Sequence, residues 1–450
     1  MSKVISFRKI SIYKFRKGFG FYFPLLLFCC FLGLTAKGQE TAFNPAQLEA
    51  ALARAKPGTH ITIGPGNYSN WAVTVSQSGT REKPLVISGS ENMETVFSGQ
   101  GGPKTFFTIT GDHVRLENIV FRDIVFERSI VRLVGSEGSK LSNCVFRDNR
   151  ALKQMTYMVS VSDNGLNNEI SDNHFENIQD AVLVQVSVQG IQRENPHGPN
   201  APTKTKKGWD PEHPIDFAQN IFPVGTKIHH NIFKDIPRIQ WNNGGEGIQI
   251  GQYQNLAGEA LTKVEVYENK FIRYMGEGEV ISNKSSGNLF YNNYFEDCGG
   301  SLVLRGGNDC KIYGNEFRGG EGGIRVFGTG HEIFDNIIEG TDRGILLGYG
   351  TGRRSELTFY TAVENCTIRN NKIINAKVYA VYVGHGKGIQ WQHLTDRVSL
   401  GKVQNIPPQR NFIFDNLIVG AFNKGIIVDG APENEIRDNT LTSILKLKDR

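Results

Sequence analysis

Residues 265–295 read EVYENKFIRYMGEGEVISNKSSGNLFYNNYF, and this stretch contains two copies of one short phrase, EVYENKF and LFYNNYF. Each copy places an Asn, Asn269 or Asn293, two residues before a Phe. Self-similarity of this kind indicates a protein built from repeats. Related phrases recur along much of the chain: EISDNHF at 169–175, KIHHNIF at 227–233, KIYGNEF at 311–317, EIFDNII at 332–338, TIRNNKI at 367–373, FIFDNLI at 412–418 and EIRDNTL at 435–441.

The Asn residues of these phrases recur at a nearly constant interval. From Asn269 the next ones are Asn293, Asn315 and Asn336, at steps of 24, 22 and 21 residues. The phrases alternate in polarity and are rich in β-branched and aromatic residues, which favours short strands. The sequence therefore predicts an all-β fold, a single right-handed parallel β-helix in which each repeat is one coil. We expect the Asn amides to stack from coil to coil.

Larger steps between the Asn residues predict loops inserted into particular coils. A polar segment at 189–220 follows Asn173, and further insertions lie between Asn336 and Asn371 and between Asn371 and Asn416. Because loops on a rigid scaffold often carry function, we expect them to form a substrate groove. The open end of the stack needs a cover, and an amphipathic helix after the cap-like pair Asn44–Pro45 is predicted there. Its buried face would comprise Leu48, Ala51, Leu52 and Ala55.

The first 38 residues are typical of a secretory signal rather than of the fold. Residues 1–38 contain seven Lys or Arg and no acid, and an apolar run covers 19–34 before small residues at Ala36 and Gly38. The run is shorter than the ~20 residues that a spanning helix needs. We therefore expect export to the periplasm or the medium, a mature β-helix domain at 39–450, and no membrane span in the mature protein.

The mature part carries a net charge near −2, because the formal +5 of the whole chain includes the seven bases of the signal segment. The charge thus gives no reason to expect nucleic acid as a partner. Any attraction to an acidic partner must come from a local basic patch, and we expect a monomer. The remaining cysteines are too sparse for a disulfide scaffold and are expected to be buried thiols: Cys144, Cys298, Cys310 and Cys366.

The densest group of functional residue types lies between residues 242 and 325. Glu277 and Glu279 are two residues apart, so a strand would place them on one face. Two close carboxylates repel unless a cation lies between them, and oxygen ligands without His or Cys suit calcium. Asn243, on an earlier coil, could add an amide oxygen. The alternative is an ordinary solvated Glu pair on a strand.

A basic ladder is predicted beside this acidic pair. Lys284 and Arg305 are 21 residues apart, and Arg325 follows 20 residues later. At a coil length near 22 residues these side chains would stack about 5 Å apart. A solvated basic face is the alternative, above all for Arg325.

These parts match the needs of β-elimination on a uronic acid. A cation at the carboxylate would stabilise the charge that develops when the C5 proton is removed. Lys284 could remove this proton if Arg305 and the calcium lower its pKa towards neutrality. Arg305 could hold the developing charge or help to protonate the departing glycosidic oxygen.

The stretch at 276–317, GEGEVISNKSSGNLFYNNYFEDCGGSLVLRGGNDCKIYGNEF, with GGIRVFGTGH at 322–331, resembles polysaccharide lyase family 6, the group of chondroitinase B and alginate lyases. LEAALARAKPGTHITIGPGNYSNWAV at 48–73 and GTREKPLVISG at 79–89 are similar to the opening coil of that family. The resemblance implies Lys284 as the Brønsted base and Arg305 as the acid. It also implies a calcium ion on three ligands: Asn243 (or its neighbour Asn242), Glu277 and Glu279.

The family often has a His after the catalytic Arg, where this chain has Gly306, and this departure bears on substrate preference. Alginate is the expected substrate. Dermatan sulfate is the runner-up, because Arg353 and Arg354 could recognise sulfate. Further candidates for substrate binding, or for simple loop packing, are aromatic or basic residues of the inserted loops together with the last rung of the ladder: Arg325, Tyr349, Trp391 and His393.

Two other classes of protein share the expected fold. A pectinase-type glycoside hydrolase would need paired acids at set separations, and the sequence shows no Asp cluster on adjacent coils. A non-catalytic glycan-binding β-helix would use Lys284 and Arg305 only to bind a polyanion. A lyase differs from both in producing a 4,5-unsaturated sugar end.

Overall fold

The computed structural model describes residues 40–100, 105–188, 222–251, 260–353, 360–391, 403–420 and 425–442. Within these ranges the chain forms one helix and forty strands. The predicted signal segment lies outside the described residues. No helix among the described residues is long and apolar enough to cross a bilayer.

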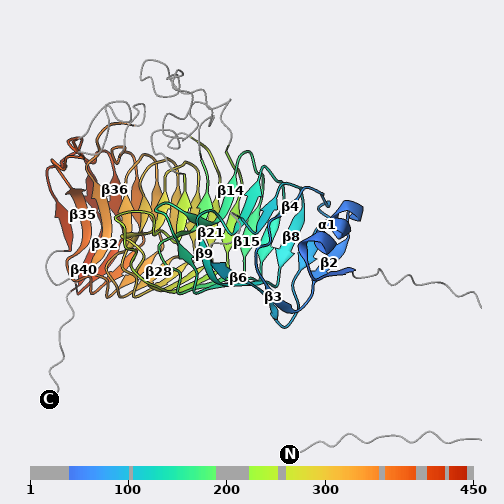
Figure 1. The fold of residues 1–450 in the computed structure, drawn as a ribbon. Coiled ribbons are helices and arrows are strands. Elements are labelled where there is room, and N and C mark those ends of the chain that lie inside the picture. Colours follow the sequence, from blue (N-terminus) through green and yellow to red (C-terminus); the bar gives the residue numbers. More distant parts are fainter. Residues whose placement is uncertain are drawn as a thin grey trace, which may run out of the picture. The chain divides into compact units, whose positions relative to one another are not determined.

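The strands belong to three sheets that the chain visits in a fixed order, A, then B, then C, before it returns to A one coil further along (Figure 1). Neighbouring strands within each sheet pair in parallel, as β23 (Glu279–Asn283) does with β26 (Ser301–Leu304). This arrangement confirms the predicted all-β parallel β-helix. Sheet A contains β1 (Glu40–Ala42), β2 (His60–Ile63), β5 (Leu85–Ser88), β8 (Val114–Glu117), β11 (Lys140–Ser142), β15 (Glu169–Ser171), β18 (Lys227–His229), β21 (Glu265–Tyr267), β24 (Leu289–Tyr291), β27 (Lys311–Tyr313), β30 (Glu332–Phe334), β33 (Thr367–Arg369), β36 (Phe412–Phe414) and β39 (Glu435–Arg437).

Sheet B follows sheet A after a tight corner, and sheet C forms the third side of each coil. Sheet B contains β3 (Gly66–Tyr68), β6 (Thr95–Gln100), β9 (Val120–Phe126), β12 (Val145–Arg147), β13 (Arg150–Ala151), β16 (His174–Glu176), β19 (Ile232–Ile236), β22 (Lys270–Tyr274), β25 (Tyr294–Glu296), β28 (Glu316–Arg318), β31 (Ile337–Glu339), β34 (Lys372–Ile374), β37 (Leu417–Val419) and β40 (Thr440–Thr442). Sheet C contains β4 (Val73–Val75), β7 (Phe107–Ile109), β10 (Val131–Val134), β14 (Tyr157–Ser162), β17 (Val182–Val186), β20 (Ile248–Ile250), β23 (Glu279–Asn283), β26 (Ser301–Leu304), β29 (Ile324–Val326), β32 (Arg343–Gly348), β35 (Tyr379–His385) and β38 (Ile426–Val428).

The corner between sheets A and B explains the recurring Asn. The residue before it adopts a left-handed backbone conformation, as Asn292 does with φ 55°, which Asn, Asp and Gly tolerate best. The Asn itself is buried, and its amide joins neighbouring coils. The Asn293 side chain donates to the Val266 carbonyl (2.9 Å) and to Oδ1 of Asn315 (2.9 Å). The same amide-to-amide bond recurs along the stack from Asn173 to Asn439, which confirms the predicted ladder.

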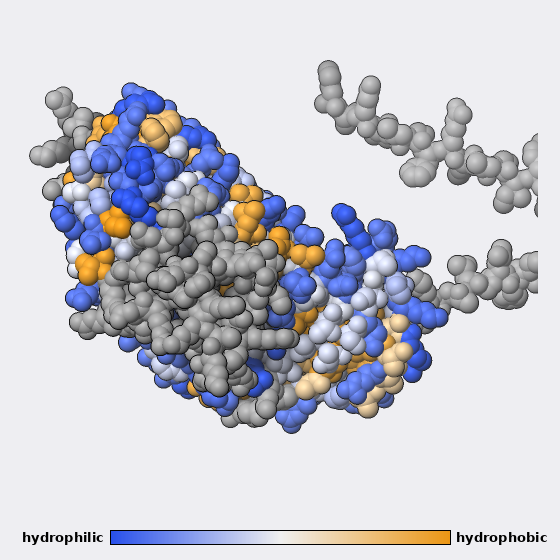
Figure 2. Space-filling model, turned by 90° about the horizontal axis from the view of Figure 1, so that it is seen from above, coloured by the Kyte–Doolittle hydropathy of each residue, from blue (hydrophilic) through white to orange (hydrophobic). Residues whose placement is uncertain are grey.

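The interior of the coils is apolar and stacked in register. Where the phrase ends in Phe, the ring lies on the ring of the previous coil, and Phe271 and Phe295 have centroids 4.9 Å apart. On the face seen in Figure 2, apolar side chains of the described residues form only small groups among hydrophilic ones. The four cysteines of the described ranges are buried and form no disulfide, as predicted.

Helix α1 (Pro45–Arg54) covers the first coil. The Asn44 side chain accepts a hydrogen bond from the Gln47 amide (2.9 Å), and Pro45 occupies the first helical position. Leu48, Ala51 and Leu52 are buried, and Ala55 packs against the same core. The predicted capping helix is confirmed.

The insertions all occur at one corner of the coil. The segments 189–221, 252–259, 354–359 and 392–402 lie outside the described residues, and each of them follows a strand of sheet C and precedes a strand of sheet A. Sheet C is therefore the expected functional face, because loops on a rigid scaffold often carry function.

The Asn ladder makes a direct prediction about stability. Asn293→Ala leaves the buried Asn269 amide and the Val266 carbonyl without their partners, so the free energy of unfolding should fall by roughly 2–4 kcal/mol. Chemical denaturation measures the loss. Asn292→Gly, at the exposed neighbouring position, preserves the left-handed conformation and should change stability by less than about 0.5 kcal/mol. Equal losses in the two variants would contradict the role of the ladder.

Candidate functional site

Three carboxylates meet at the start of β23 on sheet C. Glu277 and Glu279 come from this coil, and Glu246 comes from the coil of β20, which pairs with β23. One oxygen of each lies within 4.8 Å of the others. Glu246 and Glu279 are buried, and Glu277 is partly buried.

Backbone and side-chain donors hold two of these carboxylates in place. Gly244 and Gly245 donate their amides to Oε2 of Glu277 at 3.0 and 3.4 Å. The Gln249 side chain donates to Oε1 of Glu246 (2.6 Å). The other oxygen of Glu246, Oε2, is buried and has no hydrogen-bond partner. A buried, unpaired carboxylate oxygen is costly and indicates a missing positive group.

The carboxylates differ in their affinity for protons. Burial, together with the negative charges of Glu246 and Glu279, raises the pKa of Glu277 to about 8. Burial alone would also raise the pKa of Glu279, but Arg305, Arg325 and Lys284 lower it to about 2. A bound cation would favour the ionised form of Glu277 as well.

Two basic side chains, the buried Lys284 and the partly buried Arg305, lie beside the carboxylates. Lys284 Nζ is 4.0 Å from Oε1 of Glu246, and Arg305 Nη1 is 3.6 Å from Oε2 of Glu279. Lys284 follows Asn283 in the chain, and Arg305 follows Leu304. Because Asn283 and Leu304 are register partners, the structure places the two bases at equivalent positions of adjacent coils, as the spacing predicted.

Arg325 departs from the predicted ladder. Leu304 pairs with Val326, so Phe327 takes the third position in the row. Arg325 lies two residues earlier on the same strand, and its Nη2 forms an ion pair with Oε1 of Glu279. The ladder is therefore two residues long, because the turns of successive coils differ in length.

The surroundings shift the pKa values of Lys284 and Arg305 in opposite directions. Lys284 is 3% exposed. Its burial lowers its pKa, and Arg305 adds to this effect, whereas Glu246, Glu279 and Glu277 oppose it. Burial would also lower the pKa of Arg305, but Glu279 acts together with Tyr360 and the other two carboxylates of the cluster to outweigh burial and raise it. Lys284 is thus the group that can lose its proton, and Arg305 stays charged.

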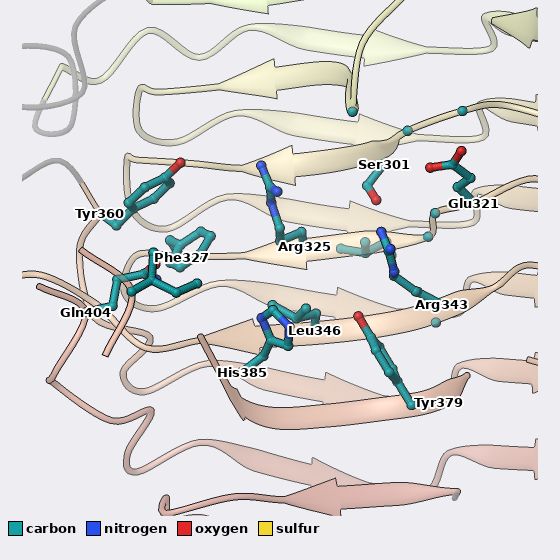
Figure 3. A pocket seen from close by; sticks show the side chains of 18 of the residues that line it. Ser301, Glu321, Arg325, Phe327, Arg343, Leu346, Tyr360, Tyr379, His385 and Gln404 are labelled. Carbon is teal, nitrogen blue, oxygen red and sulfur yellow. The ribbon is translucent and has the colours of Figure 1, made fainter. Parts of the chain in front are cut away.

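A pocket of about 300 Å³ opens on sheet C next to these residues (Figure 3). Arg325 and Gly278 line it on the side of the carboxylates. Its aromatic wall is formed by Phe327, Tyr360 and Trp391, with ring centroids 4.5 and 5.0 Å apart. The Arg305 guanidinium lies 5.4 Å from the centre of the Tyr360 ring. Trp391, a predicted substrate-binding residue, is thus part of the pocket.

Tyr349 and Arg353 have other surroundings. Tyr349 is 2% exposed, and its hydroxyl donates to the Gly430 carbonyl (2.7 Å), which corresponds to the loop-packing alternative. Arg353 forms an ion pair with the buried Glu364, which also accepts from Arg410 (2.7 Å). Neither residue lines the pocket.

The remaining predicted residues are the metal ligand, Asn243 or Asn242, and two residues of the inserted loops, Arg354 and His393. Asn243 is half-buried and directly precedes Gly244, the donor to Glu277, whereas Asn242 is exposed. This difference favours Asn243 over Asn242. Arg354 and His393 lie outside the described residues.

Sequence reasoning gave Glu246 no role, although the NGGEG phrase at 243–247 was the available signal. It did not find Arg343, Tyr379 and His385, which also line the pocket. No motif marks these three, because they belong to coils whose insertions interrupt the repeat.

A parallel β-helix with a Lys–Arg pair beside an acidic cluster and a surface pocket is the arrangement expected of a β-helix polysaccharide lyase. A family model described as chondroitinase B matches residues 43–440. The chain therefore belongs to the chondroitinase B family, a family of polysaccharide lyases. A search of curated proteins found no match.

Solved structures of similar fold include the family 6 alginate lyase AlyGC (22% identity, TM-score 0.69), with 91% of this chain and 52% of that chain covered. The chain thus spans about half the length of AlyGC. A mannuronic acid specific family 6 lyase from the human gut microbiota is 22% identical (TM-score 0.71; 91% and 87% covered). The family 6 polysaccharide lyase Pedsa3628 from Pseudopedobacter saltans is 20% identical (TM-score 0.67; 89% and 93% covered).

Because Arg353 forms an ion pair with Glu364, we expect a substitution of Arg353 to affect stability and not substrate binding. Arg353→Ala should lower the free energy of unfolding by roughly 1 kcal/mol, a modest loss because Arg353 is partly exposed and Arg410 and Gln409 still bind Glu364. Denaturant unfolding and the KM for polymer together test this assignment. A raised KM with unchanged stability would show instead that Arg353 contacts the polymer.

Proposed function

We propose that this protein cleaves uronic-acid polysaccharides, alginate first among them, by β-elimination that leaves 4,5-unsaturated oligosaccharides. The observation that carries the proposal is the pair of Lys284, which is buried, and Arg305, which is partly buried, on adjacent coils beside three carboxylates and a pocket. In this proposal the protein is exported through its signal segment, acts as a monomer and binds an anionic polysaccharide.

Lys284 is the proposed base. The reaction requires an uncharged amine that can take the C5 proton of a uronate. Burial supplies the first part of that requirement, because it disfavours the ammonium form of Lys284, and the Arg305 cation adds to it. When Nζ takes the proton, the electrons of the C5–H bond form the C4–C5 double bond, and the bond from C4 to the glycosidic oxygen breaks.

Arg305 is the proposed partner of the departing oxygen. Its raised pKa keeps the guanidinium charged, so it acts by donating hydrogen bonds to the oxygen as negative charge develops there. The proton that completes the new hydroxyl reaches the oxygen through water. The Tyr360 ring and Glu279 both contact the guanidinium and help to position it.

Calcium is the proposed cofactor, held by Glu246, Glu277 and Glu279 with the amide oxygen of Asn243. The donor set contains only hard oxygen atoms, which calcium prefers, and the buried Oε2 of Glu246 lacks the positive partner that an ion would provide. When bound, the ion supplies neutralisation of the substrate carboxylate, which makes the C5 proton more acidic.

Alginate is the proposed substrate for two reasons. Similar solved structures carry the descriptions alginate lyase and mannuronic acid specific lyase. Arg353, the described residue that could have recognised a sulfate, is paired with Glu364. The glycoside hydrolase alternative is disfavoured, because that chemistry works with two carboxyl groups alone and gives no role to Lys284 and Arg305, which lie against the carboxylates.

The proposal is tested by the ultraviolet absorbance of the unsaturated product from alginate, pectate and dermatan sulfate. Absorbance should rise with alginate, and Lys284→Ala should lower kcat by roughly 10²–10⁴-fold because the general base is lost. Lys270→Ala removes an exposed lysine of β22 and serves as the control. Cleavage without any absorbance, or full activity of Lys284→Ala, would contradict the proposal.

Calcium binding is tested separately from activity. Calorimetric titration of the chelated protein with calcium should show binding and a higher melting temperature, since a ligand of the folded state stabilises it. Glu246→Gln should weaken calcium affinity roughly 10-fold or more, whereas Glu321→Gln, at an exposed acid of the pocket rim, should not. If the wild-type protein binds no calcium, the proposed metal site is wrong.

A further inference from the structure

Arg343 differs from the other arginine of the pocket, Arg325, in its charged neighbours. It lies at the start of β32 and lines the pocket wall. Among the described residues no carboxylate lies within ion-pair distance of its guanidinium, and the adjacent Asp342 is paired with Lys377 (2.9 Å). By contrast, the other arginine of the pocket, Arg325, is neutralised by Glu279.

Two further polar side chains accompany Arg343. Tyr379 of β35 is its register partner, so both side chains leave sheet C on the same face. The Tyr379 side chain is almost fully buried, while His385, at the end of β35, is exposed. In Figure 3 the side chains of Arg325, Arg343, Tyr379 and His385 surround the pocket around Leu346.

These groups offer donors and an acceptor in a small space. The guanidinium can bind a carboxylate with two parallel hydrogen bonds, and the Tyr379 hydroxyl can add a third. Partial desolvation of its ring and the charges of Arg343 and Arg325 lower the pKa of His385, which favours the neutral ring that can accept from a sugar hydroxyl. Glu321 is the one acid among the described residues that line the pocket; it is exposed, and its Oε1 lies 3.9 Å from Nη2 of Arg238.

The position of Arg343 separates it from the reacting sugar. Arg305 follows β26, and β32 lies two strands further along sheet C. At a strand spacing of about 4.8 Å the two arginines are roughly 10 Å apart along the stack, and Arg343 also lies nearer the opposite end of its strand. An anion held by Arg343 therefore belongs to a neighbouring unit of the polymer and not to the unit that is cleaved.

We propose that Arg343, with Tyr379 and His385, forms a second anion subsite that binds the carboxylate of a uronate flanking the cleaved unit. This inference rests on the proposed function and deepens it by naming the substrate class, a polymer of consecutive uronates. A polymer in which uronates alternate with neutral or sulfated sugars presents a different group at this position.

The subsite is tested by calorimetric binding of a saturated hexauronate to protein that carries Lys284→Ala, so that no cleavage occurs. Adding Arg343→Ala should weaken binding roughly 10-fold, the effect of losing a charge-assisted hydrogen bond of about 1.5 kcal/mol. Arg343→Lys should retain part of the affinity, because it keeps the charge but not the fork. Arg115→Ala, at an exposed arginine of β8 in sheet A, is the matched control and should leave binding unchanged.

The outcomes separate this subsite from the proposed function. Hexauronate affinity that is the same with and without Arg343→Ala would overturn the subsite while leaving the lyase proposal intact. Failure of the Lys284→Ala protein to bind any uronate oligomer would contradict both. A dermatan sulfate hexamer serves as the second ligand, and an equal or larger loss of its affinity on Arg343→Ala would show that the arginine recognises sulfate instead of a flanking carboxylate.

Discussion

The register between successive coils is the constraint on which the rest of the structure depends. A buried Asn at the corner between sheets A and B bonds to the Asn of the next coil, so this corner sets the register of each coil against its neighbour. The positions of the functional side chains follow from that register. Lys284 and Arg305 meet only because Asn283 and Leu304 are partners in that register. A slip by one residue would turn these side chains to the opposite face of the sheet.

Within this fold the site brings together charges of both signs, and burying any one of them without the others would be unfavourable. Three carboxylates share a small buried space, and Lys284, Arg305 and Arg325 lie against them. Low exposure strengthens these interactions and separates the roles of the bases: Lys284 has a lowered pKa, whereas Arg305 stays charged. One carboxylate oxygen of Glu246 remains without a partner, and that imbalance is the structural argument for a cation.

The sequence was sufficient for the features that repeat and insufficient for those that do not. The Asn phrase and its period predicted the coils and the ladder, and the spacing of 21 residues predicted the meeting of Lys284 with Arg305. The similar spacing to Arg325 misled, because turn lengths vary by a residue or two and Phe327 occupies the equivalent place. Arg343 and Tyr379 carry no motif at all, since long insertions separate their coils from the regular period and only the strand pairing brings them together.

The central claim is that this face of sheet C breaks a glycosidic link by elimination and not by adding water. Mass spectrometry of the early products from alginate in ¹⁸O-labelled water tests it most directly. Elimination predicts that every new non-reducing end is one water lighter than a saturated end and that the cleavage itself introduces no label. Saturated products that carry ¹⁸O at the new reducing end would contradict the account and would identify a hydrolase.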